Sequence, residues 1–199
     1  LCRLPGAAAG RRIGGTAVSA RRLTLYVPKR DELWYRQALE ADPATMSYNM
    51  GYDLDFAGYH RDTGCIDFPK DQWAKWYDCS VGREPLRFYA YLARKEDGAW
   101  VGEVNYHQNP GQSWHDLGVL IQAEHRGCGY AAEALALLEY QAFEVDGIHM
   151  LHNEFETGRA AACRAHLSAG FSEYRRENGL IELLLTREQY FARQSRQRE

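Results

Sequence analysis

The residues best suited to chemistry lie in a short glycine-containing loop near the middle of the chain. Gly127 and Gly129 flank Cys128, after an apolar segment at 115–121 and before a segment at 130–143 with apolar residues at helical spacing. Glycine lets the backbone approach a ligand closely, and the first-turn amides of a helix are unpaired donors at its positive end. This order of strand, loop and helix predicts a site for an anion, above all a pyrophosphate.

Two acidic residues lie on apolar segments that precede this loop. Glu103 lies in WVGEVNYH, and Asp116 lies in WHDLGVLI. A carboxylate at such a position can accept a proton during a reaction, so each is a candidate general base. The alternative is an acid that faces solvent or pairs with Lys or Arg. His115 should face away from Asp116, because successive side chains of a strand alternate between the two faces.

Length and composition describe one globular domain. The 199 residues suffice to bury a core, and the apolar share of 45% with a charged share of 26% excludes a disordered or membrane class. The formal charge is −3, but residues 1–22 hold five arginines and no acid, which leaves 19 basic against 27 acidic residues. The remainder is therefore acidic, so we expect no nucleic-acid or membrane partner, and a cationic substrate fits better.

The five cysteines are odd in number and show no metal-ligand spacing. This pattern favours a reducing, cytoplasmic location and predicts neither a disulfide framework nor a bound metal. Cys128 in the glycine loop is either a small side chain at a permissive position or an oxidisable thiol, since helix-end amides lower the pKa of a thiol.

Periodicity and turn residues predict one domain over residues 23–190, after a disordered basic extension at 1–22 and before a polar tail at 191–199. The aromatic-rich stretch 44–68 predicts a long loop. The predicted strands are 23–27, 86–94, 100–107, 115–121, 148–155, 171–176 and 180–185. The predicted helices are 31–41, 69–79, 130–143 and 158–169.

Two other phosphate loops can be compared with this one. A nucleotide P-loop needs Gly-Lys followed by Ser or Thr, which does not occur in the sequence. The dinucleotide fingerprint is formally met by Gly127, Gly129 and Ala132, with Glu154 as a ribose ligand. However, an antiparallel meander leads into this loop where that fingerprint requires a βαβ unit, so a dinucleotide-binding protein is the weaker alternative.

The loop and its helix resemble the GNAT superfamily of acyl-CoA-dependent N-acetyltransferases. The signature [QR]-x-x-G-x-[GA] is matched by Arg126, Gly129 and Ala131, and the run 130–135 is similar to that of ribosomal-protein N-terminal acetyltransferases. The resemblance covers about residues 23–185. It implies an α/β (α+β) fold with a mixed, mostly antiparallel, splayed sheet of six to seven strands and about four flanking helices.

The resemblance also implies acetyl-CoA as co-substrate, with its pantetheine arm along the strand segment 117–121 and its pyrophosphate on the loop amides from Arg126 to Ala131. Arg126 binds phosphate or has a structural role, and Arg159, at a helix start, binds a CoA phosphate or an acid of the protein. Glu133 is expected at the helix surface. The cofactor-binding candidates are Leu117, Val119, Ile121, Arg126, Gly127, Cys128, Gly129, Tyr130, Ala131 and Arg159.

Relatives usually carry a proton-donating Tyr four residues before a Gly-Phe pair. Here Gly170-Phe171 places His166 at that position. An imidazolium can also donate a proton near neutral pH, so His166 is the candidate acid, and a structural histidine is the alternative.

The sequence therefore predicts an acetyl-CoA-dependent N-acetyltransferase that moves an acetyl group to a primary amine by direct attack in a ternary complex, without a metal. The catalytic candidates are His166, Asp116 and Glu103. The acceptor is a protein N-terminus, a polyamine-like or aminoglycoside-like amine, or an amino acid, and a homodimer is left open. The competing class is a non-catalytic module that binds acyl-CoA or another protein.

Overall fold

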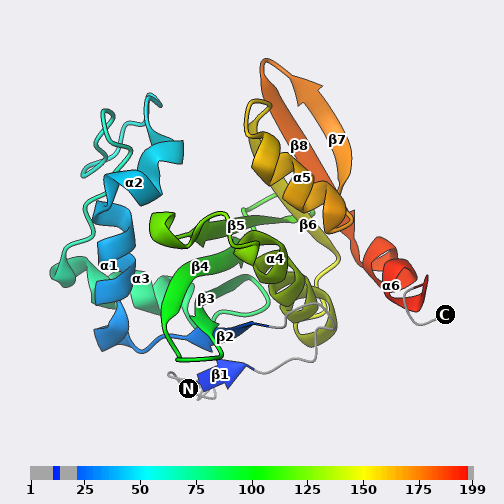
Figure 1. The fold of residues 1–199 in the computed structure, drawn as a ribbon, viewed down its shortest axis with the longest axis horizontal. Coiled ribbons are helices and arrows are strands. Elements are labelled where there is room, and N and C mark those ends of the chain that lie inside the picture. The colour runs from blue at the N-terminus through cyan, green and yellow to red at the C-terminus, as the bar shows by residue number, and fades with distance from the viewer. Residues whose placement is uncertain (1–10, 14–21, 197–199) are drawn as a thin grey trace.

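One twisted sheet organises the computed structural model, which describes residues 11–13 and 22–196 (Figure 1). The sheet has eight strands in the order β1-β2-β3-β4-β5-β6-β8-β7. The strands are β1 (Arg11–Ile13), β2 (Leu23–Val27), β3 (Arg87–Arg94), β4 (Trp100–His107), β5 (His115–Ile121), β6 (Met150–Glu156), β7 (Ser172–Glu177) and β8 (Leu180–Thr186). The α-helices are α1 (Trp34–Ala41), α2 (Pro43–Met46), α3 (Trp73–Ser80), α4 (Tyr130–Tyr140), α5 (Ala160–Ser168) and α6 (Arg187–Arg196).

This architecture confirms the predicted fold class and each of the seven predicted strands. The expectation that residues 1–22 lie outside the fold was wrong for Arg11–Ile13, which pair antiparallel with β2 as an eighth strand. The rest of that prediction falls on residues 1–10 and 14–21, which are outside the described residues. At the other end, α6 extends the domain to Arg196, beyond the expected boundary at 190.

Different helices cover the two faces of the sheet. On one face, the hydroxyl of Tyr106 in β4 donates to Asp146, just after α4, and Asn153 in β6 contacts His166 in α5. On the other face, Glu103 in β4 pairs with Arg36 in α1. We call these the α4 face and the α1 face. β3 is buried on both, which is why its sequence RFYAYLAR is almost continuously apolar.

The core lies mainly between the sheet and α4. Leu135, Leu138 and Phe143, from α4 and the π-helical turn that follows it, are at most 1% exposed. Full burial of each such side chain contributes roughly 1.5–3 kcal/mol. The sequence of α4 is apolar nearly all round, as expected of a helix that packs against a sheet and against α5, and Glu139 of α4 also pairs with Arg193 of α6.

The central strands separate along part of their length. β5 and β6 pair in parallel only at His115↔Leu151 and Asp116↔His152, whereas β4 follows β5 as far as Gly102↔Ile121. From Leu117 onward, the side of β5 that faces β6 has no ladder partner. In Figure 1, β6 and β8 rise away from β5. We call this wedge the V, and its closed end the vertex.

Gly102 allows β4 to follow β5 up to the glycine loop. A Cβ atom at this position would lie 2.1 Å from the carbonyl oxygen of Leu120, a backbone atom that cannot move aside. We predict that Gly102→Ala lowers the free energy of unfolding by about 3 kcal/mol, measured by chemical denaturation. Gly158→Ala is the matched control, because no atom lies within 4 Å of the added Cβ and little change is expected. Equal stability of the two variants would contradict this account.

Candidate active site

The glycine loop leads from β5 directly into α4. Gly127 and Gly129 adopt the left-handed conformation, with φ of 76° and 78°, which glycine enters without steric cost. Gly129 is the N-cap of α4, and no side chain caps the helix. Within the described part of the chain, the amides of residues 127–129 donate to no protein acceptor. These donors lie at the positive end of the helix dipole, an arrangement that favours the binding of an anion.

Arg22 lies beside this loop, although the sequence analysis placed it outside the fold. Its guanidinium carbon is 4.7 Å from the centre of the Tyr130 ring. Its backbone amide and Nε donate to the Glu133 carboxylate at 2.8 and 2.5 Å. Glu133 is only 8% exposed, so the expectation that it lies at the helix surface was wrong. Its burial is compensated by Arg22, a partner 111 residues away that no local pattern could reveal.

Arg126 anchors the loop to α2. Its guanidinium donates to the carbonyl oxygens of Ile121, Ala44 and Thr45 at 3.2, 3.0 and 2.6 Å. The hydroxyl of Thr45 also accepts from the amide of Ala123 at 3.0 Å. Arg126 therefore has the structural role, which was one of the two roles considered for it.

Arg159 joins α5 to the aromatic loop. Its Nη2 donates to the carbonyl oxygen of Tyr48 at 2.6 Å, and its guanidinium carbon lies 5.2 Å from the centre of that ring. Its Nε lies 2.5 Å from a carboxylate oxygen of Glu156. Arg159 thus pairs with an acid of the protein, which was one of the two roles considered for it.

Glu103 is a buried counterion on the α1 face. One carboxylate oxygen lies 2.5 Å from Nη1 of Arg36, and the other accepts from the hydroxyl of Tyr89. Arg36 also pairs with Glu40 at 2.5 Å. Burial raises the pKa of Glu40 to about 7, and the positive charge of Arg36 opposes this shift. Both oxygens of Glu103 are therefore engaged by fixed donors.

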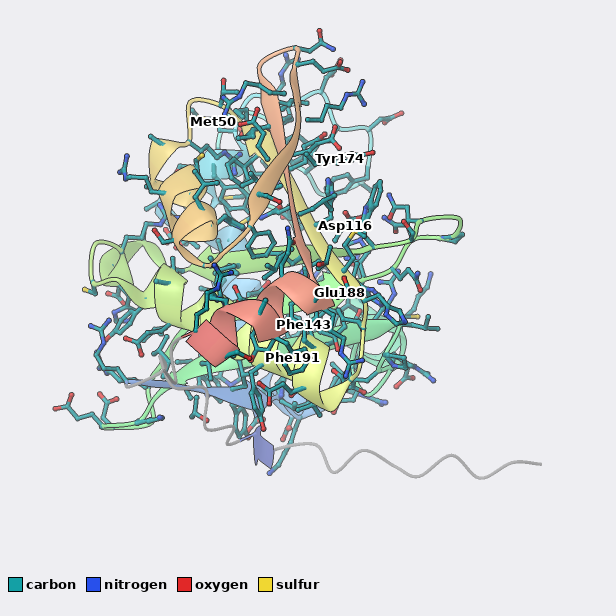
Figure 2. The ribbon with its side chains drawn as sticks, turned by 90° about the vertical axis from the view of Figure 1, so that its right-hand side faces the viewer. Met50, Asp116, Phe143, Tyr174, Glu188 and Phe191 are labelled. Carbon is teal, nitrogen blue, oxygen red and sulfur yellow. The ribbon has the colours of Figure 1, made fainter. Side chains whose placement is uncertain are left out.

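Asp116 lies at the vertex of the V on the α1 face. One carboxylate oxygen is 2.6 Å from Nδ1 of His152 and 3.2 Å from the indole nitrogen of Trp114, and the other accepts from Asn109 at 2.9 Å. The other ring nitrogen of His152 lies 3.5 Å from Glu182. Figure 2 shows Asp116 on the opposite side of the β7–β8 hairpin from α5.

The sequence analysis missed His152 as a site residue. It is brought to Asp116 by the parallel pairing Asp116↔His152, which joins residues 36 positions apart. Alternation along HDLGVLI predicted that Asp116 and His115 lie on opposite faces of the sheet. The register of β6 against β5 cannot be read from the sequence. His115 lies on the α4 face, as alternation predicted, with Nε2 at 3.0 Å from the carbonyl oxygen of Pro85.

His166 lies on the α4 face and is 5% exposed. Its Nδ1 lies 2.8 Å from the carbonyl oxygen of Ala162 and must therefore donate to it, while Nε2 lies 2.9 Å from the amide nitrogen of Asn153 on β6. Burial lowers the pKa of His166, because a charged ring is poorly solvated between Phe155 and Phe171. Asp116 and His166 thus lie on opposite faces of the sheet. Asp116 is on β5, and His166 of α5 lies beside β6, the other strand that bounds the V.

The comparisons with known proteins agree with this geometry. The family model described as acetyltransferase (GNAT) domain matches residues 22–172. The chain therefore belongs to the GNAT acetyltransferases, and it is an enzyme of the N-acetyltransferase class. No curated protein sequence matches it significantly.

Solved structures of GNAT proteins share the fold at low sequence identity. A spermidine N-acetyltransferase from Vibrio cholerae, in complex with CoA and spermine, is 16% identical, with a TM-score of 0.66 over 85% of this chain and 98% of that one. A GNAT-family acetyltransferase from Bacillus anthracis is 14% identical, with a TM-score of 0.62 over 85% and 98%.

The residues that the structure describes contain no helix long and apolar enough to cross a membrane. Among the same residues, no group of three His, Cys, Asp or Glu side chains is placed to hold a metal ion.

The bonds of Arg126 predict a stability effect. Arg126→Ala removes a charged donor from three carbonyl groups, so we expect the free energy of unfolding to fall by about 1 kcal/mol in a denaturation experiment. Arg61→Ala is the control, because that exposed side chain forms only a 3.8 Å ion pair with Asp53. If Arg126→Ala proved as stable as the wild type and lost affinity for CoA, the anchoring role would be refuted.

Proposed function

We propose that this chain transfers the acetyl group of acetyl-CoA to a primary amine by direct attack in a ternary complex. The observation that carries the proposal is the V, an unpaired strand edge that runs into a loop of unpaired amides. An extended ligand with amide groups can bond to the free edge of β5, and its pyrophosphate can bond to the loop. Because this chain belongs to a family of acetyltransferases, we infer that the extended ligand is an acetyl-CoA molecule.

The residues present fit the coenzyme. Backbone groups of Leu117, Val119 and Ile121 would hold the pantetheine arm, because β6 leaves them unpaired. The amides of residues 127–131 would hold the pyrophosphate, and no atom lies within 4 Å of a Cβ added to Gly127, so the backbone is open to a ligand there. Acetyl-CoA supplies the thioester. Arg126 and Arg159 lie at the edges of this site, where their positive charges would attract the phosphates of CoA while both side chains keep their contacts within the protein.

Asp116 is the proposed general base. It lies at the vertex of the V, where an arm that runs from the loop along β5 would end. His152, Asn109 and Trp114 hold the carboxylate in place, so it can accept the proton of the attacking amine directly or through one water molecule. Glu103 is the weaker candidate, because its side chain is only 6% exposed and is paired with the permanent charge of Arg36, whereas the side chain of Asp116 is 23% exposed.

His166 is the proposed acid that protonates the leaving thiolate from the α4 face. Because burial lowers its pKa, the ring must first take up a proton at Nε2 from solvent, and the imidazolium then gives that proton to the thiolate sulfur and returns to the neutral form. The acceptor is a primary amine. The spermidine N-acetyltransferase similarity supports a small amine, and the run at 130–135 supports a peptide terminus.

Asp116→Asn tests the base. The amide keeps the shape of the side chain and cannot accept the proton, so kcat should fall about 100-fold or more while the KM for acetyl-CoA changes little. Turnover is measured as thiol release over a panel of amines. Asp53→Asn, a change at an acid with a 99% exposed side chain, is the control. Wild-type chain that released no thiol with any amine would contradict the proposed transfer to a primary amine.

His166→Phe tests the acid. The ring is already packed among Phe155 and Phe171, so phenylalanine should fold in its place. We expect kcat to fall while the Kd for CoA is unchanged. In the wild type, a rate that needs the imidazolium falls as the pH rises through the lowered pKa of His166, and the variant should lack that fall. An unchanged kcat, or an unchanged pH profile, would remove His166 from the mechanism.

A further inference from the structure

We propose that the amine acceptor carries a carboxylate, which a cationic pocket on the α1 face holds beside the vertex of the V. This inference rests on the proposed function and narrows its acceptor to amines with an anionic group a few bonds from the nitrogen. The pocket has a volume of about 140 Å³ and lies between α3 and strands β3 and β4. Its polar lining includes Arg36, Ser80, Arg87, Asn105 and His107.

The pocket lies next to the proposed reaction centre. Asn105 pairs with Gly118 across the β4–β5 ladder, and His107 pairs with Asp116. The side chain of Asn105 lies over Gly118, where an added Cβ would be 2.6 Å from its amide nitrogen, so Asn105 is the polar group between the pocket and the V. Because adjacent strands are about 4.8 Å apart, His107 lies one strand spacing and Arg87 two strand spacings from Asp116 in the register Arg87↔His107↔Asp116.

The side chains that line the pocket favour the binding of an anion. Arg36 and Arg87 line the pocket and no acidic side chain does. Arg36 is neutralised by Glu40 and Glu103, but Arg87 is exposed and forms no ion pair with any residue that the structure describes. The guanidinium of Arg87, with polar hydrogens from Asn105, Ser80 and His107, provides the donors that a carboxylate requires.

The size of the pocket limits what it can hold. A cavity of about 150 Å³ accommodates a molecule as large as benzene. A space of 140 Å³ can therefore take the end group of an acceptor but not a second coenzyme. The acceptor would place its carboxylate against Arg87 and extend its amine past Asn105 and His107 to Asp116. A diamine of the same length would place a second positive charge against Arg87, which is unfavourable.

Three amines with the same four-carbon chain test this assignment: γ-aminobutyrate, butylamine and putrescine. We expect kcat/KM for γ-aminobutyrate to exceed that for butylamine by about tenfold, because one charge-assisted contact has that worth. Putrescine should be the poorest of the three. Arg87→Gln should bring the ratio of γ-aminobutyrate to butylamine close to one. Lys75→Gln, the same charge change at an exposed lysine of α3, should leave the ratio as in the wild type.

A binding measurement separates this inference from the proposed function. Butyrate has the carboxylate but no amine, so it should bind wild-type chain in calorimetry and bind Arg87→Gln about tenfold more weakly. If butyrate binds in this way and no amine is acetylated, the pocket assignment stands and the proposed function fails. If butylamine and putrescine are acetylated at least as well as γ-aminobutyrate, or if Arg87→Gln leaves both butyrate binding and the ratio unchanged, the inference is overturned.

Discussion

The short parallel pairing between β5 and β6 is the constraint on which the rest of this structure depends. Two residue pairs, His115↔Leu151 and Asp116↔His152, hold the two parts of the sheet together, and the strands separate beyond them. A longer pairing would leave no free backbone groups on β5. The core compensates for the open edge, since α4 contacts β2, β4 and β5 on one side of the V and α5 on the other. Packing between helices therefore stabilises a sheet that its own ladder leaves divided.

This division separates two kinds of chemistry by face. In the function proposed here, the glycine loop, His166 and the N-terminal end of α4 would serve the coenzyme, whereas Asp116 and the cationic pocket would serve the acceptor. The carboxylate of Asp116 is held by three donors and remains about one quarter exposed, while His166 is nearly inaccessible and is held neutral by burial. On this proposal, the V would let groups from both faces of the sheet reach one reacting centre, which a continuous sheet would keep apart.

The buried charges show how the site is kept rigid. Arg36 is fixed by two carboxylates, Glu40 and Glu103, and it lies over the ring of Trp76 at 4.5 Å. Such a cluster contributes little net stability, because the loss of solvation offsets the attraction between the charges. The cluster instead fixes position, since it holds α1 against β4, and Arg36 forms part of the wall of the pocket between α3, β3 and β4. Arg126 has the same effect on the loop and α2.

The amino-acid sequence by itself determined the elements and the loop. Alternation and turn residues located the seven strands from β2 to β8, and the spacing of Arg126, Gly129 and Ala131 identified the family, because these signals depend on residues close together in the chain. Only the tertiary structure decided the partners. Asp116 meets His152, Glu133 meets Arg22 and Arg126 meets Thr45 through contacts that depend on strand register and on the packing of distant segments. Register changes which face a side chain occupies, and no local pattern contains it.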